Sequence, residues 1–228
     1  MEILYEDNHI IIVNKRAGEI VQGDKTGDEP LGETLKKFIK ERDAKPGAVF
    51  MGVVHRLDRP VSGAVMFAKT SKALARLNAM FAAGDIHKTY WAISRNRPAE
   101  DSASLTHYIT TVERNNKSYA SPEPVPGAKE ARLQYRLAAV GERYCLLEVR
   151  LLTGRKHQIR VQLSAIGSPV KGDLKYGDRR SNPDGSISLH ARRIQFVHPV
   201  SGKEIDIIAP VPAGDRLWAE LEQAATHD

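Results

Sequence analysis

Short runs of apolar, largely β-branched residues recur along this chain, and they do not alternate regularly with helical segments. The clearest is Ile10-Ile11-Ile12-Val13, which suits a buried strand. Strand-like runs outnumber helix-like ones, whereas a parallel sheet would need the two to alternate. The sequence therefore predicts an α+β fold with a mixed, mostly antiparallel sheet flanked by helices and loops. No change of composition marks a boundary, so residues 1–228 are expected to form one domain.

Local signals place further elements. A helix is predicted between the capping residue Thr70 and Gly84, because apolar residues recur at helical spacing between them. A hairpin turn is predicted at Asn115-Asn116. A second helix is predicted to start at Thr153-Gly154 and to end at Ile166. Strands are also expected at 63–68, 88–93, 131–140, 144–152, 188–197 and 203–208, helices at 32–42 and from 215, and loops at 121–127 and 170–186.

The chain carries 34 Lys and Arg against 28 Asp and Glu, a net charge of +6. Basic residues that cluster in this way favour a polyanion such as nucleic acid, although a surface kept soluble by its charge would look the same. Aromatic residues make up 6% of the chain, which argues against single-strand binding on a platform of stacked rings. The basic clusters all lie in the second half of the chain, at residues 155–160, 171–180 and 192–193.

Several classes of protein are excluded or disfavoured. The one cysteine, Cys145, cannot form an internal disulfide, which favours a reducing cytoplasm. No apolar run approaches the length of a membrane span, and the acidic start is unlike a signal peptide. The eight histidines are scattered without metal-ligand spacing, and no glycine-rich phosphate loop is present. The sequence therefore predicts neither a metal nor a cofactor.

Two segments carry candidate reactive groups. Asp58 lies between Arg56 and Arg59 in a loop that follows an apolar segment, and these cations would keep the carboxylate ionised. The alternative is a loop aspartate that caps backbone amides. Further along, His157 and Arg160 are three residues apart and would be neighbours on a helix. An arginine beside a buried stripe needs an anionic partner, for which Asp58 is a candidate, although an ordinary basic helix face is the alternative.

A third segment, Lys88-Thr89-Tyr90, reads as part of a strand, where a tyrosine is most often core or rim packing. Together these segments resemble the RluA-type pseudouridine synthases. Four ordered motifs carry the resemblance: His55-Arg-Leu-Asp58-x-x-x-Ser62-Gly63, Lys88-x-Tyr90, Leu152-Thr-Gly-Arg155-x-His157-Gln-Ile-Arg160, and Leu189-His-Ala191 with Phe196-x-His198-Pro199. One departure is Val61, where the family usually has threonine, so that a loop hydroxyl is lost.

The resemblance implies an isomerase that converts uridine in RNA to pseudouridine without a cofactor. It assigns the essential carboxylate to Asp58, which attacks the sugar C1′, adds to C6 of the base or removes a ribose proton. It makes Arg160 the partner that keeps Asp58 ionised, and it places Tyr90 against the target base, where it can assist proton transfer at C5. Substrate-binding roles are implied for Lys88, Leu152, Arg155 and His157.

The target uridine must leave its stack to reach Asp58, and Arg56 would fill the gap or hold a phosphate. Arg155 and a basic loop are expected to contact the RNA backbone. The loop cations are Lys171, Lys175, Arg179 and Arg180. The partner is expected to be ribosomal or transfer RNA, and the protein is expected to act as a monomer without a membrane, a metal or the N-terminal RNA-binding module of many relatives.

Two other functions remain open. One is a catalytically silent RNA-binding or ribosome-assembly protein on the same fold. It would be favoured by a change at Asp58 or Tyr90, and both residues are present. The other is a hydrolase that uses Asp58 as its nucleophile, for example on a glycoside, but no second carboxylate stands out to assist it.

Overall fold

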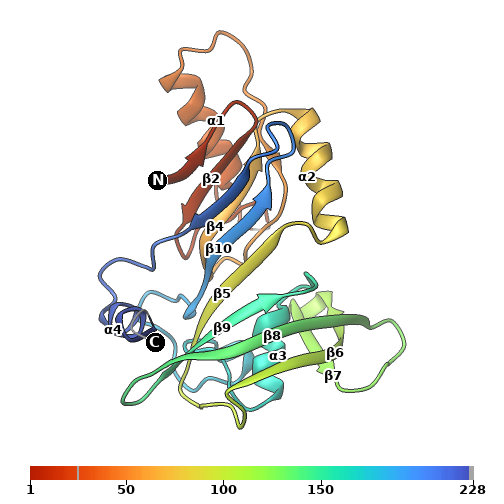
Figure 1. Ribbon diagram of the computed structural model, residues 1–228, viewed down its shortest axis with the longest axis vertical. Helices are drawn as coiled ribbons and strands as arrows, with labels where there is room; N and C mark the ends of the chain where they lie inside the picture. Colours follow the sequence, from red (N-terminus) through yellow and green to blue (C-terminus); the bar gives the residue numbers. More distant parts are fainter. Residues whose placement is uncertain (25, 226–228) are drawn as a thin grey trace. The chain divides into compact units, whose positions relative to one another are not determined.

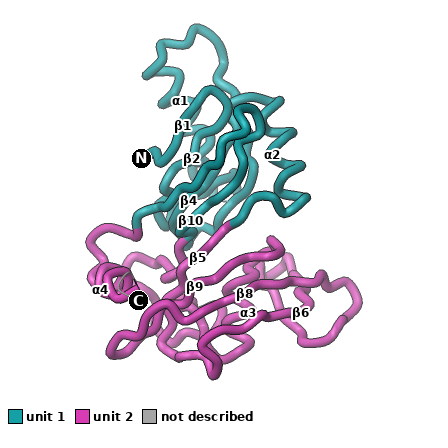
Figure 2. The backbone as a smooth tube through the Cα atoms, in the orientation of Figure 1, with its two compact units in different colours: residues 1–87, 191–210 teal, residues 88–190, 211–228 magenta. Residues whose placement is uncertain are grey.

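The computed structural model describes residues 1–24 and 26–225 (Figure 1). The chain folds into two compact units (Figure 2). Unit 1 contains residues 1–87 and 191–210, and unit 2 contains residues 88–190 and 211–228. The chain leaves unit 1 in strand β5 (His87–Ser94) and returns to it in strand β10 (Leu189–Val197). Each unit combines antiparallel strands with helices, which confirms the predicted α+β class, whereas the assignment of residues 1–228 to one domain stays a prediction.

Unit 1 is built on the predicted strand at residues 10–13, which is the core of β2 (Ile10–Lys15). These four apolar residues are fully buried, because both faces of the strand are covered. β2 lies between two antiparallel neighbours, β1 (Glu2–Glu6) and β4 (Ser62–Ala68). The short β3 (Gly52–Val53) pairs with β4, β10 lies beside β4, and β11 (Glu204–Ile208) pairs with β10.

Two helices cover the two faces of this sheet. Helix α2 (Ser71–Ala83) packs Ala73 and Leu77 against the face that carries Ile10 and Ile12. The opposite face carries Phe67, whose ring lies beside Gly32 at the start of helix α1 (Leu31–Arg42). α2 begins and ends as predicted: the Thr70 hydroxyl accepts a hydrogen bond from the Ala73 amide at 3.1 Å, and Gly84 adopts the left-handed conformation.

Unit 2 holds five strands in the order β5-β9-β8-β6-β7, and its neighbouring strands are all antiparallel. Helix α4 (Arg216–Ala225) inserts Trp218 and Leu221 against Trp91 and Ile93 of β5. The other elements of this unit are β6 (Ser102–Val112), β7 (Lys117–Ser121), β8 (Lys129–Val140), β9 (Cys145–Leu151), helix α3 (Gln158–Ala165) and the 3-10 turns η1 (Glu113–Asn115) and η2 (Leu174–Tyr176).

Three expectations need correction or refinement. The helix expected from Thr153-Gly154 begins only at Gln158, and His157 lies before it in the left-handed conformation, so His157 and Arg160 do not share a helix face. Strands β1, β3 and the first part of β6 are additional to those predicted. The segment at 170–186, predicted as a loop, contains the turn η2 and several buried side chains. The turn at Asn115-Asn116 is confirmed, because it joins β6 to β7.

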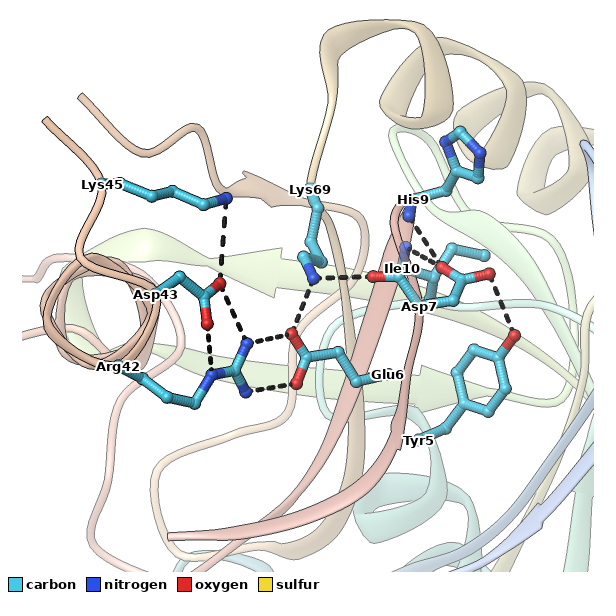
Figure 3. A network of polar contacts seen from close by, with 9 residues as sticks. All are labelled: Tyr5, Glu6, Asp7, His9, Ile10, Arg42, Asp43, Lys45 and Lys69. Carbon is cyan, nitrogen blue, oxygen red and sulfur yellow. Dashed lines mark hydrogen bonds and ion pairs between the residues drawn. The ribbon is translucent and has the colours of Figure 1, made fainter. Parts of the chain in front are cut away.

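A network of charges ties the start of unit 1 together (Figure 3). The Glu6 carboxylate accepts two hydrogen bonds from Arg42 at the end of α1, at 2.7 and 2.8 Å, and one from Lys69 at 2.6 Å. These cations lower the pKa of Glu6 to about 2. Asp7, the next residue, accepts hydrogen bonds from the amides of His9 and Ile10 and so forms the turn between β1 and β2.

The Glu6 network predicts how stability depends on pH. Because the pKa of Glu6 is lower in the folded chain than in the unfolded chain, its stabilisation is present above about pH 4.5 and is lost as the pH falls towards 2. We expect Glu6→Gln to lower the free energy of unfolding at neutral pH and to flatten its acid dependence, as measured by urea titration. The exposed Glu33→Gln, which removes only an i,i+3 pair with Lys36, is the control. Parallel acid dependences for Glu6→Gln and the wild type would contradict the prediction.

Candidate active site

Asp58 lies in unit 1, in the loop that runs from β3 to β4, and it is half-buried. The loop turns at Pro60, where the Val61 amide donates to the Asp58 carbonyl at 3.0 Å. On the β3 side, His55 Nε2 accepts a hydrogen bond from the Met66 amide, and the ring lies 5.2 Å from that of Phe81. The loop is therefore fixed to the sheet before the carboxylate and closed by a tight turn after it.

A buried lysine at the end of β2 also binds the backbone of this loop. Lys15, at the end of β2, is 1% exposed, and four backbone carbonyl oxygens lie within hydrogen-bond distance of its ammonium, which has three N–H donors to share among them. Three belong to the Asp58 loop: Val61 at 2.6 Å, Arg59 at 3.1 Å and Asp58 itself at 3.4 Å. The fourth is the carbonyl of Arg16 at 3.0 Å. Burial lowers the pKa of Lys15 to about 8, while the carboxylates of Glu19 and Asp58 act in the opposite direction.

The residues that follow Asp58 explain why this motif tolerates valine at 61. Both loop contacts of Val61 use backbone atoms, its amide towards Asp58 and its carbonyl towards Lys15, so neither needs the hydroxyl of a threonine. Gly63 is in the left-handed region with φ of +113°, and a Cβ there would collide with the backbone of Ala191 in β10. Only glycine permits this close approach of the two strands.

The two arginines beside Asp58 have different surroundings. Arg59 pairs with Asp28 at 2.6 Å and with Asp24 at 3.3 Å, so its charge is neutralised by carboxylates other than Asp58. Arg56 is exposed, and its guanidinium donates to the Gln22 side chain at 3.3 Å. An exposed guanidinium two residues before the carboxylate is available to a phosphate or a base.

In unit 2, Lys88 and Tyr90 lie on β5 and point away from the face that packs on α4, since Trp91 occupies that face. Tyr90 is buried, and its register partner is Val149 of β9. Burial lowers the pKa of Lys88 to about 8. A Cβ on Gly154 would lie 4.0 Å from the Lys88 ammonium, so β5 and the motif at residues 152–160 are neighbours.

The segment from Leu152 to Gln158 is an ordered loop fixed to β8. The amides of Leu152 and Thr153 both donate to the Arg132 carbonyl, and the Gln158 side chain accepts from the Thr153 hydroxyl and the Arg155 amide, each at 2.9 Å. Leu152 remains 45% exposed, and Arg155 is exposed although its Nε donates to the Glu130 carbonyl. The loop thus presents an apolar and a cationic side chain at the surface of unit 2.

Arg160 is buried in α3, and its requirement for an anion is met within unit 2 by Asp173. Its Nε and Nη2 donate to the two carboxylate oxygens at 2.6 and 3.0 Å, and the two side chains are 7% and 1% exposed. The amphipathic-helix alternative does not describe this residue, because its charge is paired in the interior. Asp173 lies in the segment that the sequence predicted as a loop, so the sequence offered no signal for it as a partner.

The predicted site residues thus form two groups. Arg56 and Asp58 lie in one loop of unit 1, while Lys88, Tyr90 and the segment that contains Leu152, Arg155, His157 and Arg160 lie in unit 2. The pairing of Asp58 with Arg160 stays a prediction. Sequence reasoning missed Lys15, Asp173 and Tyr176. A lysine directly after four buried apolar residues was a usable signal for the first, whereas the other two depend on contacts with distant segments.

Comparison with known proteins decides the family. A family model described as RNA pseudouridylate synthase matches residues 9–165, which is more than half of the chain. The chain belongs to the RNA pseudouridylate synthase family. It is 34% identical over 230 residues to ribosomal large subunit pseudouridine synthase C of Vibrio cholerae, with 98% of this chain and 68% of that protein covered. It is 33% identical to tRNA pseudouridine synthase C of Vibrio parahaemolyticus, with 97% and 93% covered.

The solved structure of human RNA pseudouridylate synthase domain containing 4 has the same fold, with a TM-score of 0.79 and 22% identity over 99% of this chain and 93% of that chain. The family model and the two relatives confirm the RluA-type resemblance, and the protein is an RNA pseudouridine synthase. In the part of the chain that the structure describes, no group of three or more His, Cys, Asp or Glu residues is placed to hold a metal ion. None of the helices described is long and apolar enough to cross a membrane.

Proposed function

We propose that this synthase isomerises specific uridines in structured ribosomal or transfer RNA, with Asp58 as the essential carboxylate. The observation that carries the proposal is the Asp58 loop itself: the motif carboxylate stands in a turn whose carbonyls are tied to buried Lys15. The names of the relatives from Vibrio cholerae and Vibrio parahaemolyticus support both classes of RNA.

In the reaction the N1–C1′ bond breaks, the base turns and C5 bonds to C1′. The C5 proton moves to N1 through solvent, so atoms balance without a cofactor.

The other predicted residues receive roles in the same proposal. Arg160 keeps Asp58 ionised, and Tyr90 lies against the target base and assists removal of the C5 proton. Arg56 occupies the space that the flipped uridine leaves or binds a phosphate, which suits its exposure. Lys88, Leu152, Arg155 and His157 bind the substrate. We place the enzyme in the cytoplasm, since a buried free Cys145 suits a reducing compartment, and we propose that it acts as a monomer.

The experiment that tests this function maps pseudouridines in total RNA from cells with and without the gene. We expect one or a few sites to disappear on deletion, to return with the wild-type gene and to remain absent with Asp58→Ala. Deletion that changes no site would overturn the proposal. Return of the sites with Asp58→Ala would instead show that the carboxylate is dispensable. A silent RNA-binding protein would leave the map unchanged while it still bound RNA.

The basic loop gives a prediction about salt. Lys175, Arg179 and Arg180 are exposed, whereas Lys171 is half-buried and donates to Asn182, so it is less suited to contact RNA than the sequence suggested. If Arg179 and Arg180 each contact one phosphate, Arg179→Gln/Arg180→Gln should reduce the slope of log affinity against log salt by about 1.4, at roughly 0.7 per phosphate.

Filter binding of the target RNA at several salt concentrations measures that slope. The matched control is Arg143→Gln/Arg216→Gln, which removes two exposed arginines elsewhere in unit 2 and should leave the slope unchanged. An equal change in both double variants would show that only net charge matters, and an unchanged slope in the first would exclude its two arginines as phosphate contacts.

A further inference from the structure

The turn η2 places two buried side chains beside the Arg160 segment. Asp173 is 1% exposed and Tyr176 is 4% exposed, although both lie in a stretch rich in Gly, Asp, Lys and Arg. Tyr176 packs with Val161 of α3 and with Ile109 and Ala131 of the sheet, so the turn is part of the core of unit 2. Burial of Asp173 and Tyr176 in a stretch that is otherwise polar suggests that their side chains do more than close a loop.

Asp173 and Tyr176 contact the same guanidinium from two directions. The carboxylate binds its Nε and Nη2 edge in a bidentate ion pair, which fixes the plane of the group. The Tyr176 ring lies under it, with the guanidinium carbon 5.0 Å from the ring centroid. An arginine side chain otherwise has about 2 kcal/mol of rotamer entropy to lose. Arg160 is therefore held in one orientation before any RNA binds.

Tyr176 also determines the position of His157. Its hydroxyl oxygen is 2.7 Å from His157 Nδ1 and accepts a hydrogen bond from the Ser118 amide at 2.8 Å. His157 has a φ of +55°, a left-handed conformation that costs a residue other than glycine about 1 kcal/mol or more. The hydrogen bond to Tyr176 compensates for that strain and orients the imidazole. Tyr176 thus contacts both His157 and Arg160 of the motif at residues 152–160.

We infer that Asp173 and Tyr176 are positioning residues, which hold the Arg160 guanidinium and the His157 imidazole in the orientation that uridine isomerisation needs. The inference rests on the proposed function, because it takes Arg160 as a group that acts on Asp58 and His157 as a group that binds the substrate. Neither positioning residue is required to contact the RNA. Their removal should therefore slow the chemical step more than it weakens RNA binding.

The test compares Asp173→Asn and Tyr176→Phe with two matched controls. Asp173→Asn removes one charge and keeps the size of the side chain, and Tyr176→Phe removes only the hydroxyl. Asp184→Asn and Tyr119→Phe make the same changes at a surface carboxylate and an exposed tyrosine. Single-turnover conversion of an RNA that carries the mapped target site gives the rate, and filter binding gives the dissociation constant.

We expect Asp173→Asn to lower the single-turnover rate by about 100-fold, the scale of a misplaced catalytic group, with RNA affinity within about threefold of the wild type. Tyr176→Phe should lower the rate by about tenfold, since the ion pair and the ring remain. The controls should match the wild type. Wild-type rates for both Asp173→Asn and Tyr176→Phe would overturn the inference, whereas a wild-type enzyme that converts no uridine would overturn the proposed function instead.

A spectroscopic measurement separates positioning from mere stability. The Nε–Hε resonance of Arg160, identified in the wild type by its absence in Arg160→Lys, should be shifted and protected from exchange by the carboxylate. In Asp173→Asn its chemical shift should move towards the values of the exposed arginines. In Tyr176→Phe the change in chemical shift should be smaller. If Asp173→Asn fails to fold, Tyr176→Phe carries the test alone. A variant that melts earlier but turns over normally per folded molecule would show that the role is structural only and would overturn the inference.

Discussion

Replacement of Asp58 by asparagine is expected to abolish the conversion of uridine to pseudouridine, by about 10⁴-fold or more, while RNA affinity stays within about threefold of the wild type. The neutral amide can neither attack carbon nor accept a proton as the carboxylate does. The change should not disturb the loop, because Lys15 holds it through the backbone carbonyls of Asp58, Arg59 and Val61. Asp58→Asn should therefore lose the conversion of uridine while it keeps its affinity for RNA.

Release of tritium from RNA labelled at C5 of uridine measures this reaction directly, because C5 loses its hydrogen when it bonds to the sugar. The control is Asp85→Asn, which removes an exposed carboxylate of unit 1 and should convert RNA at the wild-type rate. Conversion by Asp58→Asn at more than about a tenth of the wild-type rate would assign the carboxylate chemistry to another residue.

The second large effect is expected at Arg160. Arg160→Met keeps an unbranched apolar stem and removes the guanidinium, so turnover should fall by about 100-fold or more with RNA affinity nearly unchanged. The substitution also leaves Asp173, which is 1% exposed, without its bidentate partner. A buried charge that loses its partner costs about 3–5 kcal/mol of stability, so the variant should also unfold at a lower urea concentration.

A double variant separates these two consequences. In Arg160→Met/Asp173→Asn the buried carboxylate is replaced by a neutral amide, so most of the lost stability should return. Turnover should not return, because the guanidinium that we propose keeps Asp58 ionised is still absent. Urea titration and single-turnover rates on the same preparations measure both effects. Recovery of turnover together with stability would assign Arg160 a purely structural role.

Much of the fold follows from local patterns. The helix between Thr70 and Gly84 was predictable because its cap and its terminator are both local signals. The strand at Ile10–Val13 was predictable from its β-branched run. Most of β6 was not, because Ser102–Val112 alternates polar residues with few large apolar ones and acquires its conformation by pairing with β7 and β8. That pairing depends on segments that the local sequence does not reveal.

The candidate site was likewise predictable only in part. Motif resemblance identified Asp58, Tyr90 and Arg160 as the residues to examine, but it could not give their contacts. The helix was expected to begin at Thr153, whereas it begins at Gln158, because the Gln158 side chain closes the preceding loop and His157 takes a left-handed conformation supported by Tyr176. A positive φ at a histidine is a product of tertiary contacts and has no sequence signature.

Lys15 gives the loop one further property. Four carbonyl oxygens converge on an ammonium that is already desolvated in the free protein, so the turn that bears Asp58 is preorganised. The conformational entropy of that turn is lost once, when the chain folds, and not again in each catalytic cycle. If uridine binds at Asp58 as proposed, it meets a loop that is already ordered, and the binding energy of the RNA remains available to unstack the base.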